Sequence, residues 1–297
     1  MQTETVESEK SRKQSGNLRR RQIVDRIATV AIFGAVILAI VPLVLILADI
    51  VIKAAPVMSF GFLTNLPKAS PFSPDQGISN AIIGSFVMVG FASLIAIPIG
   101  VGAGIFLSEW AEMRFAWVAS FTNDVLAEFP SIVIGIFVFV IIVLATHSFS
   151  GYAGGFALAV IMIPIVARTT EESLKLVPNS YREASMALGV SRWRTITRIV
   201  LSTGRGGLVT GVLLAVARVM GETAPLLLTA LGSTLAFRTL SQPTESLSLL
   251  IYFYGTSAYK TWQAQAWGAA LVLVVIVLAL NISVRALTRG KFITGGD

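Results

Sequence analysis

Residues 27–48 read IATVAIFGAVILAIVPLVLILA, 22 consecutive positions without a charged side chain. A helix needs about 20 predominantly apolar residues to cross the hydrocarbon core of a bilayer. The rest of the chain has the same character, because 55% of its 297 residues are hydrophobic and only 13% are charged. A soluble protein carries about 25% charged residues. We therefore predict an all-α integral membrane protein.

Five further apolar stretches are candidate membrane spans. In chain order they are residues 76–108, 129–146, 152–167, 207–231 and 267–286. Pro98 interrupts the first of them, so we expect its second half to be kinked or irregular. The stretch 152–167 is barely long enough and is expected to continue into the polar segment behind it. The sequence thus predicts six transmembrane helices, the first within residues 27–52 and the other five within a domain at residues 76–287.

The positive charges are distributed unequally between the two sides of these spans. Eighteen of the 23 Lys and Arg residues lie in the N-terminal tail, at Arg114, within residues 168–205 or from residue 285 onward, and only four lie on the opposite side. The positive-inside rule therefore places both termini and residues 168–205 in the cytoplasm of a cell-membrane protein. The tail at residues 1–26 lacks a periodic apolar face, so we expect it to be disordered and to lie against lipid headgroups.

The long cytoplasmic segment at residues 168–205 is expected to be helical. Within residues 181–200 the only helix breaker is Gly189, which separates two short amphipathic pieces at 182–188 and 192–201. This arrangement predicts a helix–turn–helix on the inner face of the membrane. Composition alone favours a loop that binds lipid headgroups.

Two charged residues, Arg218 and Glu222, lie inside the fifth span. Each costs roughly 2.5–3.5 kcal/mol near the centre of a membrane helix. Because they are four residues apart, they share one helical face and can neutralise each other. Such a pair can fix the register of neighbouring helices, but an intramembrane ionisable pair is by default a candidate functional site. In the functional interpretation the pair lines a translocation path, and Arg218 is the expected anion contact.

Two motifs resemble those of ABC importer permeases. Glu183, Ala184 and Ser185, followed by Gly189 and by Ile-Val-Leu at 199–201, are similar to the EAA signature, in which Glu-Ala-Ala precedes Gly and Ile-x-Leu-Pro. Ser185 replaces the second Ala, and Ser202 replaces the Pro, so the start of the fifth span is expected to lack its usual break. In that family this loop inserts into the ATPase subunit.

The second motif narrows the resemblance. Residues 217–228, ARVMGETAPLLL, resemble the phosphate-specific importer permeases of the PstA type. The resemblance covers about residues 78–286 and includes Arg168 and the Pro-Ser pair at 130–131. It implies the fold of type I ABC importer permeases, with a substrate path at Arg218, Glu222, Thr223 and Arg168. It also implies ATPase coupling through Glu183, Ala184, Ser185 and Gly189.

The resemblance further implies a set of partners. These are a second permease similar to PstC, two ATPase subunits similar to PstB, an extracytoplasmic phosphate-binding protein similar to PstS, inorganic phosphate and membrane lipid. The chain has no G-x-x-x-x-G-K-[ST] loop, so ATP is expected on the ATPase subunits and this chain is not expected to be an enzyme. With no Cys and a single His, a metal site is not expected either. The net charge of +7 reflects topology, so no nucleic-acid partner is expected.

Several alternatives stay open at this point. Within the same class, the chain could serve another oxyanion such as sulfate or molybdate, whose permeases usually carry Gly-Glu-Phe-Gly, or it could be the sister PstC type, which tends to carry Gly-Glu-Thr-Met. A gradient-driven secondary transporter predicts internal repeats and discontinuous helices, and no repeat is visible in the sequence. A membrane scaffold would leave the cost of Arg218 and Glu222 unexplained.

Overall fold

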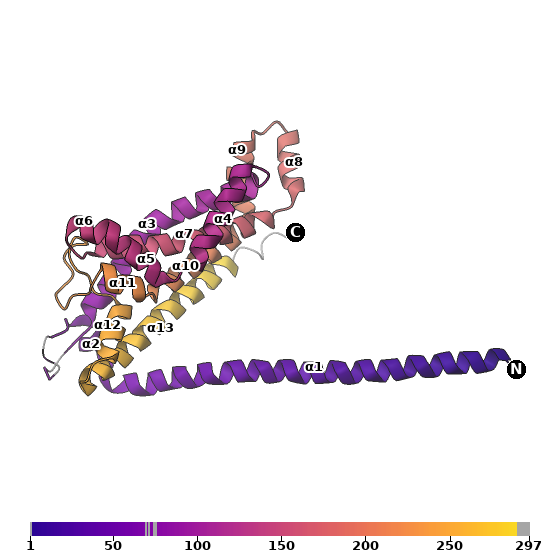
Figure 1. Cartoon of the computed structure of the whole chain (residues 1–297), viewed down its shortest axis with the longest axis horizontal. Coiled ribbons are helices and arrows are strands. Elements are labelled where there is room, and N and C mark those ends of the chain that lie inside the picture. Colours follow the sequence, from indigo (N-terminus) through magenta and orange to yellow (C-terminus); the bar gives the residue numbers. More distant parts are fainter. Residues whose placement is uncertain (1, 69, 71, 74–75, 290–297) are drawn as a thin grey trace. The chain divides into compact units, whose positions relative to one another are not determined.

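The computed structural model describes residues 2–68, 70, 72–73 and 76–289 (Figure 1). The chain divides into two compact units, Met1–Ile52 and Lys53–Asp297. The first unit is built from one helix, α1 (Gln2–Ala54), which contains the first predicted span. Residues 2–26 are helical as well, so the expectation of a disordered tail is wrong. The tail is rich in Glu, Gln, Lys and Arg, which favour helix, and it extends an existing helix without the cost of nucleation.

The second unit holds all the other elements. They are η1 (Ala55–Val57), α2 (Phe60–Thr64), α3 (Ser79–Glu109), α4 (Arg114–Glu128), α5 (Ser131–Val138), the π-helical η2 (Phe139–Val143), α6 (Leu144–Thr146), α7 (Gly151–Lys175), α8 (Asn179–Ala187), α9 (Arg192–Thr195), the π-helical η3 (Ile196–Val200), α10 (Leu201–Met220), α11 (Ala224–Thr229), α12 (Leu247–Gly255) and α13 (Lys260–Arg289). Among the described residues, five helices are long and apolar enough to cross a membrane, or six if one bent pair counts as a single span. The all-α membrane fold is therefore confirmed.

Two of the predicted spans are continuous helices. Helix α7 runs past the apolar stretch to Lys175, so it does continue into the polar segment. Helix α3 is uninterrupted from Ser79 to Glu109 although it contains Pro98. Its second half is therefore helical throughout. A proline in a membrane helix is tolerated where neighbouring helices compensate for the missing hydrogen bond.

The third predicted span is preceded by a helix that the sequence analysis missed, and the two meet at a sharp bend. Helix α4 meets α5–α6 at an angle of 101°. The bend falls at Phe129 and Pro130, both of which have extended backbone conformations. This has a local cause, because the ring of a proline disfavours the α conformation of the residue before it.

The fifth span is also broken. Helix α10 ends at Met220 and α11 begins at Ala224, with Pro225 in its first turn. Residues 221–223 lie between the two helices. The prediction of one continuous span over 207–231 is therefore wrong, and Glu222 and Thr223 belong to the break. Proline at the first turn of a helix is favoured, because its missing N–H group has no intrahelical partner there.

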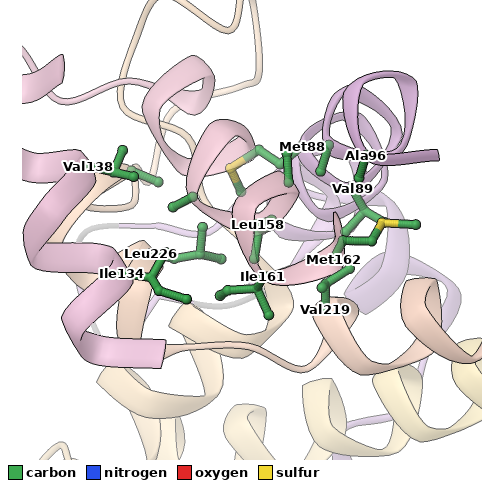
Figure 2. Close-up of a cluster of buried hydrophobic side chains, with 14 of the residues drawn as sticks. Met88, Val89, Ala96, Ile134, Val138, Leu158, Ile161, Met162, Val219 and Leu226 are labelled. Atoms are coloured by element: carbon green, nitrogen blue, oxygen red, sulfur yellow. The ribbon is translucent and has the colours of Figure 1, made fainter. Parts of the chain in front are cut away.

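The core of the second unit is centred on α7 (Figure 2). Met162 and Leu158 of α7 are buried against Met88 and Ala96 of α3, and against residues of α5, α10 and α11. Helices α3 and α7 pack closely because small residues line their contact. A Cβ atom at Gly100 would lie 2.7 Å from Cβ of Val166. Close approach through small residues is a common way for helices to associate in a membrane.

The two helical pieces predicted at 182–188 and 192–201 are present as α8, and as α9 with η3. Helix α8 and helix α9 are separated by a turn in which Gly189 has a φ of +78°. This left-handed backbone conformation favours glycine, because it lacks a Cβ atom. Helix α9 continues through η3 into α10 without a gap, as expected from the serine at position 202.

Candidate functional site

Arg218 and Glu222 form an ion pair at the end of α10. The distance from Nε of Arg218 to Oε1 of Glu222 is 3.9 Å, and their side chains are 58% and 18% exposed. The predicted pair therefore exists, but Arg218 is not buried in this chain. At 3.9 Å the contact is too long for a hydrogen bond, and among the described residues the guanidinium has no other ion-pair partner. Its donors are accessible to an anion.

The break between α10 and α11 holds the rest of the predicted path. The backbone oxygen of Glu222 accepts a hydrogen bond of 2.8 Å from Oγ of Ser248 in α12. Thr223 is the N-cap residue of α11, but its side chain makes no capping hydrogen bond. Its hydroxyl is therefore available beside the ion pair.

Helix α11, which follows the break, packs against α5, which follows the bend at Pro130. A Cβ atom at Gly135 of α5 would lie 2.7 Å from Cα of Pro225. Irregular backbone at membrane depth is tolerated where it is enclosed by protein or lines a water-filled cavity. The break thus places an accessible guanidinium and a hydroxyl, both able to donate hydrogen bonds to an oxyanion, next to a carboxylate that competes with such an anion for Arg218.

Arg168, the fourth residue predicted for the path, lies among carboxylates in the structure. Its guanidinium is 3.0 Å from Oε1 of Glu172, 3.5 Å from Oε2 of Glu171 and 3.9 Å from Oδ1 of Asp124. Lys175 reaches the same Glu171 at 2.5 Å. Asp124 belongs to α4 and the other residues belong to α7, so this network ties α4 to α7. An anion at Arg168 would have to compete with three carboxylates.

The four residues predicted for ATPase coupling lie in the α8–α9 hairpin, but they do not all face outward. Glu183, Ala184 and Gly189 are exposed. Ser185 is 4% exposed, and its Oγ atom lies 2.8 Å from Oγ1 of Thr195 in α9. Ser185 therefore holds the two short helices together, a bond that alanine at this position could not make.

The sequence analysis missed a cluster of charged side chains at the end of α3. The carboxylate of Glu109 accepts hydrogen bonds of 2.7 and 3.0 Å from Nη2 and Nε of Arg182, which lies in α8. The backbone oxygen of Glu109 accepts a hydrogen bond from Arg192 in α9. These side chains lie 73 and 83 residues from Glu109 in the sequence. The only signal in the sequence that could have pointed to this cluster was the acidic residue Glu109, directly behind the apolar stretch at 76–108.

A second missed feature is a cavity of about 290 Å³ at the opposite end of α3, lined by Asn80, Ser233, Arg238 and Glu245 among others. Burial raises the pKa of Glu245 to about 7, against the opposing effect of backbone N–H groups of residues 246 and 233. Burial, and to a smaller extent the Glu245 charge, raises the pKa of the Tyr254 hydroxyl to about 12. Glu245 lies outside the membrane-spanning helices, and the residues that line the cavity do not include Arg218, Glu222 or Thr223.

A family model and individual relatives both relate this chain to the same family of transport proteins. The model of the family described as "Binding-protein-dependent transport system inner membrane component" matches residues 96–291. The phosphate transport system permease protein PstA of Haemophilus influenzae is 43% identical over 258 residues, covering 86% of this chain and 91% of the relative. The protein of the same name from Yersinia pestis is 40% identical, covering 95% of each chain.

The fold has solved counterparts as well. A chain of a bacterial alginate ABC transporter, solved with its pentasaccharide-bound periplasmic protein, superposes with a TM-score of 0.60 at 15% identity. The match covers 92% of this chain and 97% of that one. At this identity the likeness concerns the fold alone. From the family match and the two relatives, we conclude that this chain belongs to the family of binding-protein-dependent transport system inner membrane components.

Proposed function

We propose that this chain is a transmembrane permease subunit of an ATP-driven importer of inorganic phosphate. The observation that carries the proposal is its similarity, at 40–43% identity over most of its length, to proteins named phosphate transport system permease protein PstA. The motif Gly-Glu-Thr-Ala-Pro at residues 221–225 supports the same substrate class.

In the proposed mechanism, Arg218 contacts phosphate as it passes the break in the fifth span. A planar guanidinium with several donors suits a tetrahedral oxyanion. Glu222 would repel an anion if it were unpaired, so its contact with Arg218 at 3.9 Å has a role in the cycle. Glu222 holds Arg218 while the path is closed and releases it when the path opens. The Thr223 hydroxyl supplies a further donor, whereas we assign Arg168 the role of anchoring α4 to α7.

The proposed assembly contains a second permease similar to PstC, two ATPase subunits similar to PstB and an extracytoplasmic phosphate-binding protein similar to PstS. Both termini and residues 168–205 lie in the cytoplasm, as the distribution of Lys and Arg predicts. The exposed Glu183 and Ala184 of α8 meet the ATPase, which carries out ATP hydrolysis. The loops at residues 54–77 and 233–266 receive the binding protein on the other side.

The test is uptake of radiolabelled phosphate by cells that lack their own phosphate importers and express this chain with its proposed partners. We expect phosphate uptake that excess sulfate or molybdate does not inhibit, and that stops when ATP is depleted. Uptake of sulfate or molybdate in place of phosphate would assign the chain to another oxyanion. Uptake that survives ATP depletion but stops when ion gradients are dissipated would indicate a secondary transporter, a class that also uses discontinuous helices.

A further inference from the structure

The cluster around Glu109 joins three elements at one point. The Glu109 side chain is 5% exposed and that of Arg182 is 16% exposed, so the ion pair is largely withdrawn from solvent. Besides Glu109, Arg182 donates hydrogen bonds of 3.0 Å to the backbone oxygen of Leu174 and 2.7 Å to that of Val177. These oxygens lie at the end of α7. The end of α3, the end of α7 and the start of α8 are thus held by one guanidinium.

Helix α9 is attached to the same end of α3. Arg192 donates a hydrogen bond to the backbone oxygen of Glu109, and its guanidinium lies 5.0 Å from the centre of the Trp110 ring. Since Ser185 and Thr195 also bond α8 to α9, the hairpin is fixed internally and held to α3 by two arginines. A movement of the hairpin therefore reaches α3 directly, because both α8 and α9 are bonded to the end of α3.

The other end of α3 is attached just as specifically to the segment at residues 233–247. Nδ2 of Asn80 donates a hydrogen bond of 2.5 Å to the backbone oxygen of Ser233. Oγ of Ser85 accepts a hydrogen bond of 2.8 Å from the backbone nitrogen of Leu247. Gly84 lies between them, and a side chain there would collide with the backbone oxygen of Glu245. This is the segment to which we assign docking of the binding protein.

Helix α3 is well suited to connect these two attachments. Its 31 residues span about 46 Å at 1.5 Å per residue, which exceeds the thickness of the hydrocarbon core. It packs more extensively against α7 than any other two elements of the described chain pack against each other. Figure 1 shows α3 running from the α2–α12 end of this unit to the α8–α9 end.

We propose that the contacts of Glu109 with Arg182 and Arg192 form a joint that passes movement of the α8–α9 hairpin to α3, and through α3 to residues 233–247. The proposal rests on the proposed function, because it assumes that the ATPase moves the hairpin. Glu109, Arg182 and Arg192 are positioning residues in this scheme. They contact neither substrate nor nucleotide, and they determine whether ATP hydrolysis at one face of the membrane is linked to binding-protein release at the other.

The test compares variants of this chain in the full reconstituted complex. Phosphate uptake is measured together with the ATPase rate, with and without phosphate-loaded binding protein. Glu109→Gln removes the charge that holds Arg182. The matched control is Glu112→Gln, the same change at an exposed residue three positions later. The double variant Glu109→Gln/Arg182→Gln removes the buried arginine charge as well, which relieves the destabilisation left by a broken ion pair.

For Glu109→Gln we expect phosphate uptake to fall by about tenfold or more. The stimulation of the ATPase rate by phosphate-loaded binding protein should fall by a similar factor, which is a usual size of coupling between two sites. The unstimulated ATPase rate should stay near that of the wild type. The double variant should remain uncoupled even where its assembly recovers, and Glu112→Gln should behave as the wild type does.

Two results would overturn the joint. One is a Glu109→Gln complex that couples as well as Glu112→Gln. The other is a double variant that regains uptake together with assembly, since Glu109 would then serve stability alone. A wild-type complex whose ATPase responds to the binding protein but which takes up no phosphate would refute the proposed function instead, so the two failures are distinguishable.

Discussion

Replacing Gly104 with alanine should separate α3 from α7. A Cβ atom at this position would lie 2.5 Å from the backbone oxygen of Ala167 and 2.5 Å from Cβ of Thr170. Ordinary contacts between such atoms are about 3.5 Å, so the helices must move apart by about 1 Å. A gap of 0.5–1 Å forfeits roughly a quarter to a half of the attraction of each affected pair of atoms. Overpacking of this kind costs about 1–3 kcal/mol.

Gly102 provides a matched control two residues away in the same helix. A Cβ atom there would have no neighbour within 4 Å. Both changes gain the helix propensity of alanine, about 0.8–1.0 kcal/mol, so the difference between the two variants isolates the contact between the helices.

The assay is thermal unfolding of the detergent-solubilised full chain. The Gly104→Ala variant should melt below Gly102→Ala by about 2–4 °C for each kcal/mol of lost stability. Equal melting temperatures for the two variants would refute the close packing of α3 on α7.

Three further results are expected from other parts of the chain. Gly189→Ala should loosen the α8–α9 turn and speed its cleavage in limited proteolysis, because the φ of +78° costs a non-glycine residue about 1–2 kcal/mol. Gly189→Asn should be tolerated better than Gly189→Ala. Equal cleavage rates of the wild type and both variants would contradict this. Because burial raises the pKa of Glu245 from 4.5 to about 7, folding favours its protonated form, so the melting temperature should fall as the pH rises between these values and level off above them. Glu245→Gln should flatten that profile, and an unchanged profile would argue against a buried carboxyl. Arg168→Gln should lower the melting temperature without changing the ratio of phosphate to sulfate uptake, and a changed ratio would return Arg168 to the substrate path.

The membrane class, the number of apolar segments and the α8–α9 hairpin were all predictable, because each depends on local composition. Lipid requires long apolar runs, and Gly189 separates two amphipathic pieces regardless of the rest of the fold. The ion pair of Arg218 with Glu222 was predictable for the same reason, since it joins residues four positions apart.

The bend before the third span and the break in the fifth span were harder to predict from the sequence, because glycine and proline occur in membrane helices without always interrupting them. Pro98 leaves α3 continuous, whereas Pro130 lies at a bend of 101°. Which outcome occurs depends on the neighbouring helices, and these are not visible in the local sequence.

The joint at Glu109 could not be predicted, because it is made by residues more than 70 positions away. The inward direction of Ser185 is a related case. The motif shows that a small residue belongs there, but only its contact with Thr195 shows that it serves the hairpin and leaves the outer surface to Glu183.

The central claim, that Arg218 contacts phosphate in the translocation path, is tested most directly by phosphate uptake in cells that carry Arg218→Lys in an assembled complex. Lysine keeps the charge but cannot form the paired hydrogen bonds of a guanidinium. Hydrogen bonds to charged groups contribute about 1.5–3 kcal/mol, so we predict a loss of uptake of roughly 10- to 150-fold, with a normal amount of complex in the membrane. Full phosphate uptake by Arg218→Lys would contradict the claim.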